Sequence, residues 1–206
     1  MLAKNQNLII AISILLLALI VRLLFILTLG ADERIYDSLY DQYIYIDLAR
    51  SIVAGRGLSL SHGVFVADAY TPTSIQPPVY PLILPALFFF FGESYFPIRL
   101  LQVALGAGVC VVTYLITGKI LGRSVGLVAA LIVCVYPPLV MYTRPIMTEA
   151  LYTFLMSLLV LLLVKFTVET LRGHGYHPDC TDVLCDSRAV GSKKLARSWR
   201  ANCVSQ

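Results

Sequence analysis

Long apolar runs separated by short polar segments dominate most of the chain. The first run, residues 8–29, contains a single charged residue, Arg22, and three later runs cover residues 98–117, 125–142 and 150–164. A helix of about 20 apolar residues crosses the roughly 30 Å hydrocarbon core of a bilayer. The pattern therefore predicts an all-α integral membrane protein with about four transmembrane helices.

Two shorter elements are expected in the long segment between the first two runs. Residues 36–54 contain no Gly or Pro and are followed by Gly55, a common residue after a last helical turn, which predicts a helix lying near the membrane surface. Residues 79–91 are apolar but span only about 20 Å as a helix, and they contain Pro81 and Pro85. Because this length is too short for a crossing, we expect a re-entrant or interfacial helix.

The basic residues indicate an orientation for these spans. With Lys4 inside, four crossings place the remaining basic flanks on the cytoplasmic side, as the positive-inside tendency requires; these flanks are Lys119, Arg123, Lys165 and Arg172. Residues 31–97 and the segment before the last span then share the non-cytoplasmic face. The prediction is a multi-pass protein, of the plasma (inner) membrane if the source is bacterial.

Composition supports this class of protein. The chain has 206 residues, of which 58% are hydrophobic and only 14% are charged, and its mean hydropathy is +0.80. Soluble domains are roughly a quarter charged. The net charge of +4 therefore marks the loops beside the spans, and no nucleic acid is expected as a partner.

The last part of the chain differs from the rest. We assign residues 1–172 to a membrane domain, because residues 173–206 are polar and show no apolar periodicity. This tail is interpreted either as a disordered cytoplasmic segment or as an unrelated, frame-shifted ending. Its scattered cysteines give no metal-ligand pattern, so no metal-binding residue and no firm cofactor is predicted, with a divalent metal left open.

Acidic residues of the first non-cytoplasmic segment are candidates for chemistry. Asp37, Asp41 and Tyr45 follow one another at four-residue spacing and so lie along one side of a helix. A carboxylate beside the head groups could act as a general base or align an acceptor hydroxyl. The alternative is a solvated acidic face on a surface helix.

Three further candidate residues lie at the start of a later span or shortly before one. Glu149 could cap a helix, since acids near an N-terminus complement its dipole, or it could share a cavity with Asp41. Arg144 is a candidate partner for a phosphate oxygen, which a guanidinium fork fits well. Arg99 either extends to lipid head groups or helps to hold a lipid phosphate. Arg22, inside the first span, is expected to face the bundle and to pair with a carbonyl or an acid.

Four segments together carry a family resemblance. They are DQYIYIDLARSIVAGRGLS, QPPVYPLILPALFFFFG, RLLQVALGAGVCVVTYLITGKILGR and VYPPLVMYTRPIMTEALYTFL. Their order and spacing resemble the N-terminal part of GT-C glycosyltransferases that use polyprenyl-phosphate sugars. The most similar groups are the bacterial dolichyl-phosphate-mannose protein mannosyltransferases and the aminoarabinose transferases, and the resemblance covers residues 8–168.

The resemblance implies specific roles. Asp41, Tyr45 and Ala49 match the family pattern Asp-x-x-x-Tyr-x-x-x-Ala, whose aspartate is catalytic, and Glu149 matches an acid that precedes the span after a Pro-Pro break. The implied reaction transfers a sugar from a polyprenyl-phosphate donor, with inversion, to an acceptor that is a glycan, a lipid or a protein. Catalysis is thus expected at Asp41 and Glu149, and substrate binding at Tyr45, Arg144, Arg99 and Asp37.

Length is the main departure from this family. Its members are typically more than twice as long as this chain, so the resemblance implies an interrupted copy that is inactive alone. The alternative function is that of a non-enzymatic membrane subunit or a transporter fragment.

Overall fold

The expectation of an all-α membrane protein is confirmed. The computed structural model describes residues 2–28, 40–61, 70–74, 76–77 and 79–173. Within these residues, three helices are long and apolar enough to cross a membrane: α1 (Leu2–Thr28), α5 (Phe96–Ile120) and α8 (Glu149–Gly173). Apart from Gly173, the polar tail lies outside the described residues, so its interpretation stays a prediction.

The run at residues 125–142 differs from the single span that we expected. It forms α6 (Arg123–Val135) and α7 (Pro137–Met141), with Tyr136 between them in an extended conformation at ψ 114°. The cause is local, because Pro137 and Pro138 lack the N–H groups that would continue the ladder of α6. The α6 helix alone covers only about 20 Å, which is too short for a full crossing, and the apolar run is broken where α7 begins.

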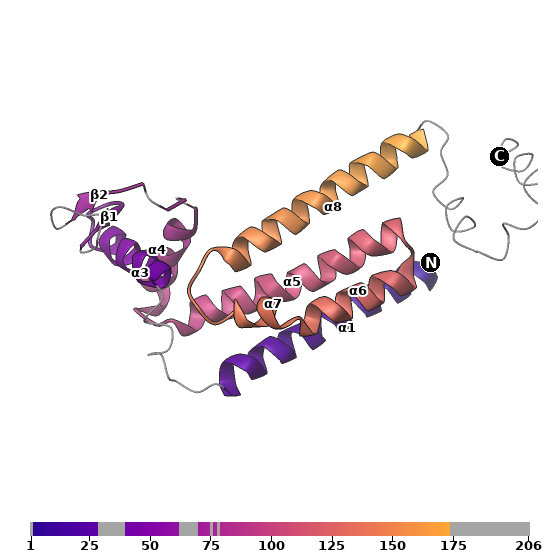
Figure 1. The fold of residues 1–206 in the computed structure, drawn as a ribbon, viewed down its shortest axis with the longest axis horizontal. Helices are drawn as coiled ribbons and strands as arrows, with labels where there is room; N and C mark the ends of the chain where they lie inside the picture. The colour runs from indigo at the N-terminus through magenta and orange to yellow at the C-terminus, as the bar shows by residue number, and fades with distance from the viewer. Residues whose placement is uncertain (1, 29–39, 62–69, 75, 78, 174–206) are drawn as a thin grey trace, which may run out of the picture.

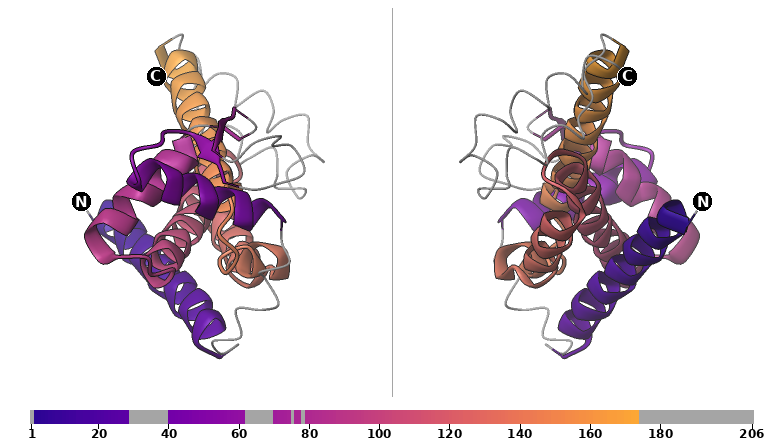
Figure 2. Two further views of the ribbon diagram at one scale, coloured as in Figure 1. Left: turned by 90° about the vertical axis from the view of Figure 1, so that its left-hand side faces the viewer. Right: turned by 90° about the vertical axis from the view of Figure 1, so that its right-hand side faces the viewer.

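The helix α5 is the centre of the bundle. It packs against α1, α6 and α8, and the views in Figures 1 and 2 place α1 and α8 on different sides of it. The crossing with α6 is close because Gly126 has no side chain: a Cβ there would lie 2.9 Å from the carbonyl oxygen of Tyr114. Small residues of this kind let helix backbones approach each other inside membranes.

A separate layer of short elements covers one end of the bundle (Figure 1). It contains α3 (Tyr40–Val53), β1 (Ser59–Leu60), β2 (Thr71–Pro72) and α4 (Val79–Phe91), and the two strands pair antiparallel. The expected helix at residues 79–91 forms with the predicted bounds, and the expected helix at residues 36–54 is described from Tyr40 onward. The hairpin was not predicted, since strands of two residues carry no alternating pattern.

The helix α4 is apolar on two faces. Tyr80, Leu84 and Phe88 are buried against α3, whereas Phe89 and Phe90 at its end are 78% and 76% exposed. An exposed aromatic surface of this kind fits an interfacial position in a bilayer.

The two ends of the bundle have different character. The N-terminus, the α5–α6 connection and the end of α8 lie at the end away from α3 (Figure 1). Arg123 Nη1 there donates to Gln6 Oε1 at 3.0 Å, which joins α6 to α1. The basic flanks Lys119 and Arg123 therefore lie at the end opposite the α3 layer, as the charge pattern predicted.

We predict that Ser94→Cys and Ser124→Cys label from opposite sides of the membrane. Ser94 is exposed between α4 and α5, and Ser124 is exposed at the start of α6. The measurement is modification by a membrane-impermeant thiol reagent in a background without the other cysteines. Labelling of both positions from the same side would contradict the crossing pattern.

Candidate functional site at the α3 end of the bundle

The segment between α7 and α8, residues 142–148, leaves the helical pattern. The N–H groups of Tyr142, Thr143 and Arg144 still donate to carbonyl oxygens three or four residues earlier, and side chains from other elements bond to the backbone beyond them. Gln102 Nε2 of α5 donates to the carbonyl oxygens of Pro145 at 2.8 Å and Met147 at 3.2 Å. Arg99 Nε donates to the carbonyl oxygen of Arg144 at 3.3 Å. We call residues 142–148 the hinge turn.

The helix α3 is attached to this turn by one buried contact. Gln42 Oε1 accepts the backbone N–H of Ile146 at 3.0 Å, and the two residues are 3% and 0% exposed. A buried N–H without a partner costs about 1–3 kcal/mol, so this contact fixes the turn as well as the helix. It joins two parts of the chain that are 104 residues apart.

Tyr45 completes the attachment one helical turn further along α3. Its O–H donates to Gln76 Oε1 at 2.8 Å, and its oxygen lies 3.2 Å from the hydroxyl oxygen of Thr148. Its ring packs edge-on against Tyr80 of α4, with a centroid separation of 5.1 Å. Tyr45 is therefore the point at which α3, α4 and the hinge turn meet.

The negative charges of Asp41 and Glu149 both raise the pKa of Tyr45. Burial raises the pKa of Tyr45 above its ordinary value, the hydrogen bond with Thr148 lowers it, and the charges of Glu149 and then Asp41 raise it further. Burial also raises the pKa of Tyr80, and the charges of Tyr45 and Glu149 add to that effect. Both phenols therefore stay protonated at neutral pH and act as hydrogen-bonding groups.

The two carboxylates differ in their surroundings. Asp41 is exposed in the first turn of α3. Glu149 is the first residue of α8, and its Oε2 is buried without a hydrogen-bond partner among the described residues. Its position fits the capping interpretation, since an acid near the start of a helix complements the dipole. No described residue forms a hydrogen bond with this carboxylate oxygen, which would be free to accept one from a bound molecule. The functional interpretation of Glu149 stays a prediction.

The remaining predicted site residues differ in how accessible their side chains are. Arg99 is half-buried at the start of α5, next to the hinge turn. The Arg144 side chain is only 2% exposed, so a phosphate would reach it only if neighbouring groups moved. Asp37 lies outside the described residues.

Sequence reasoning missed three polar residues that build this site. Gln42 and Gln102 hold the hinge turn, and Asp47 accepts the backbone N–H and the hydroxyl of Ser61 at 2.7 and 2.6 Å. Asp47 thereby fixes the start of the hairpin against α3. A usable signal existed only for Gln102, an amide side chain inside an apolar span, where polar groups are costly unless they are paired.

Metal ligands do not gather in the part of the chain that the structure describes. Within it, no group of three or more His, Cys, Asp or Glu side chains is placed to hold a metal ion.

The fold and the site together define a helical membrane protein in which the carboxylates of Asp41 and Glu149 lie around Tyr45 at one end of the bundle. Residues 75–174, just under half of the chain, match the model of a family described as dolichyl-phosphate-mannose-protein mannosyltransferase, and this match supports membership of the GT-C superfamily of membrane glycosyltransferases. No curated protein and no solved structure matches the chain. The matched range contains Arg99, Arg144 and Glu149, whereas Asp41 and Tyr45 precede it.

We predict that Gln42→Leu lowers the free energy of unfolding by about 1–3 kcal/mol, because the buried N–H of Ile146 loses its acceptor. Thermal unfolding in bilayer nanodiscs measures the change. The matched control is Gln6→Leu, which removes an exposed amide joining two helices at the opposite end of the bundle. Equal effects of the two substitutions would show that the Gln42 contact has no special role.

Proposed function

We propose that this glycosyltransferase transfers a sugar from a polyprenyl-phosphate donor to an acceptor on the non-cytoplasmic face of the membrane. The observation that carries the proposal is the position of Asp41 and Glu149 around Tyr45, at the end of the bundle opposite Lys119 and Arg123. In a bacterial source the membrane would be the plasma (inner) membrane. The acceptor is a glycan, a lipid or a protein.

Asp41 is the proposed catalytic base. Its exposure lets an acceptor approach, and its place in the first turn of α3 puts it beside Tyr45. The carboxylate takes the proton of the acceptor hydroxyl, or aligns that hydroxyl, as its oxygen bonds to the anomeric carbon. The bond from that carbon to the phosphate oxygen breaks, and polyprenyl phosphate leaves with the electron pair. Attack from the face opposite the leaving group inverts the anomeric configuration.

Glu149 and the arginines are proposed to bind the substrates. The buried, unpartnered Oε2 of Glu149 is suited to accept a hydrogen bond from a sugar hydroxyl. Arg99, half-buried next to the hinge turn, is more accessible than Arg144 and suits the donor phosphate. Arg144 contributes its backbone carbonyl to this arrangement, and its side chain is the less accessible phosphate ligand.

The exposed apolar surfaces suit a lipid-linked donor. The exposed end of α4 and much of α8 present large apolar side chains, among them Phe89, Leu159 and Phe166. These surfaces would face bilayer lipids and the polyprenyl chain, which leaves the phosphate and sugar at head-group depth. A donor held in this way needs no fully enclosed pocket.

We predict that Asp41→Asn lowers the rate of sugar release or transfer from a polyprenyl-phosphate sugar by about 10²–10⁴-fold, the range for loss of a general base. The assay counts radiolabelled sugar leaving the donor, so that it does not depend on knowing the acceptor. Folding should be unchanged, because Asp41 is exposed.

The control is Glu93→Gln, which removes an exposed acid of the same layer that pairs with Arg50 at 3.1 Å. The proposal requires this variant to keep the wild-type rate. Because the resemblance implies a chain that is inactive alone, the assay uses a version extended by the further spans of the family. Undiminished activity of Asp41→Asn would remove Asp41 from the mechanism, and inactivity of the extended wild-type version would contradict the proposed function itself.

A further inference from the structure

Arg22 is a fully buried charge inside the membrane-spanning helix α1. It is 0% exposed, Nη1 donates to the carbonyl oxygen of Ala18 in its own helix at 3.4 Å, and the guanidinium lies beside the thiol of Cys110. Nε and Nη2 have no hydrogen-bond partner among the described residues. An intramembrane arginine costs several kcal/mol unless it is paired, so its presence points to a function beyond packing.

The guanidinium lies where three elements meet. A Cβ on Gly106 of α5 would lie 2.7 Å from Arg22 Nε and 3.4 Å from the methyl group of Thr143. The side chain of Arg22 therefore passes between α5 and the hinge turn only because residue 106 is glycine. Thr143 is the second residue of that turn, and its hydroxyl donates to the carbonyl oxygen of Val140 at 2.5 Å.

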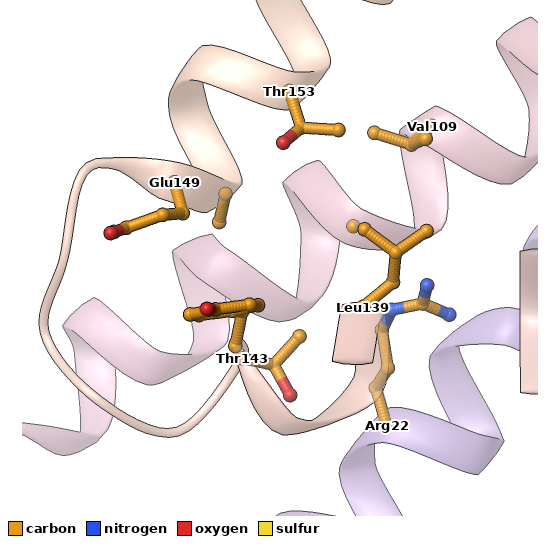
Figure 3. A pocket seen from close by; sticks show the side chains of 9 residues that line it. Arg22, Val109, Leu139, Thr143, Glu149 and Thr153 are labelled. Carbon is orange, nitrogen blue, oxygen red and sulfur yellow. The ribbon is translucent and has the colours of Figure 1, made fainter. Parts of the chain in front are cut away.

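A narrow cavity leads from Arg22 toward the candidate site. Figure 3 shows Arg22 at one end of it and Glu149 at the other, with Leu139, Thr143, Thr153 and Val109 along the walls. The free volume is about 20 Å³, which is enough for one water molecule but too small for a phosphate group. Arg22 is thus not a phosphate site, and its unpartnered N–H groups suit a bridging water.

We propose that Arg22 is a positioning residue that fixes the hinge turn, and with it Glu149, against α1 and α5. The Arg22 side chain packs beside the methyl group of Thr143, and a water in the cavity accepts a hydrogen bond from the unpartnered N–H groups of the guanidinium. Hydrogen bonds to an ordered water are nearly as favourable as direct hydrogen bonds. The inference rests on the proposed function only where it concerns activity.

The choice of variants separates positioning from general packing. Arg22→Met keeps much of the volume and removes a costly buried charge, so its melting temperature should stay the same or rise. Gly106→Ala keeps the arginine but forces it out of its place, since the added methyl group would lie 2.7 Å from Nε. The matched control is Arg123→Met, an arginine that contacts α1 at the opposite end of the bundle.

The test is amide hydrogen exchange of the peptide containing the hinge turn, measured by mass spectrometry in bilayer nanodiscs. We expect exchange at Ile146 to rise about tenfold in Arg22→Met and in Gly106→Ala, with no rise in Arg123→Met. Arg22→Lys keeps the charge but lacks the planar set of N–H donors of a guanidinium, so its exchange rate at Ile146 should lie between those of the wild type and Arg22→Met. In Arg22→Met and Gly106→Ala, the kcat of sugar transfer should fall while the KM for the donor stays constant.

Two results would overturn the inference. One is unchanged exchange of the hinge turn in both Arg22→Met and Gly106→Ala. The other is an increase spread equally over all helices, which would make Arg22 a general stability residue. Because exchange is measured without substrate, this test stays decisive whatever the result of the transferase assay.

Discussion

The hydrogen bond from the backbone of Ile146 to the side chain of Gln42 is the constraint on which the candidate site depends. Without it, α3 would be attached to the bundle mainly through Tyr45 and apolar packing. Gln102 satisfies the same turn from the α5 side. Irregular backbone at membrane depth is tolerated only when its polar groups form hydrogen bonds. Here Gln42 and Gln102 form hydrogen bonds with backbone groups of the hinge turn that have no partner within a helix.

The break that creates this turn begins with two prolines. Pro137 and Pro138 end α6 before it has the length of a full span, and the chain then needs residues 142–148 to reach the start of α8. This places Glu149 at a helix start, where its charge is favoured by the dipole, and close enough to Tyr45 for that charge to raise the pKa of the phenol, as the charge of Asp41 also does. The local chemistry of proline therefore determines where the second carboxylate lies.

The helices could be predicted from the sequence better than the side-chain contacts between them. Apolar runs located α1, α5 and α8, and the bounds of α4 were predicted correctly because prolines and a following glycine delimit that run. The contact of Gln42 was not predictable, since a side chain that bonds to a backbone group over a hundred residues away leaves no local period. Arg22 is buried and bonds to a carbonyl oxygen, as its place in an apolar run predicted, but its position beside Gly106 and Thr143 was not predictable. Asp41 and Glu149 were selected by family resemblance, and their roles remain proposals.

The shared surface of Asp41 and Glu149 is tested most directly by a distance between spin labels on Tyr43→Cys and Tyr152→Cys, two exposed positions that follow these acids by two and three residues on α3 and α8. In nanodiscs the account predicts a single narrow distance distribution that broadens when Gln42→Leu is added. A broad distribution in the otherwise native chain, or one unaffected by Gln42→Leu, would contradict it.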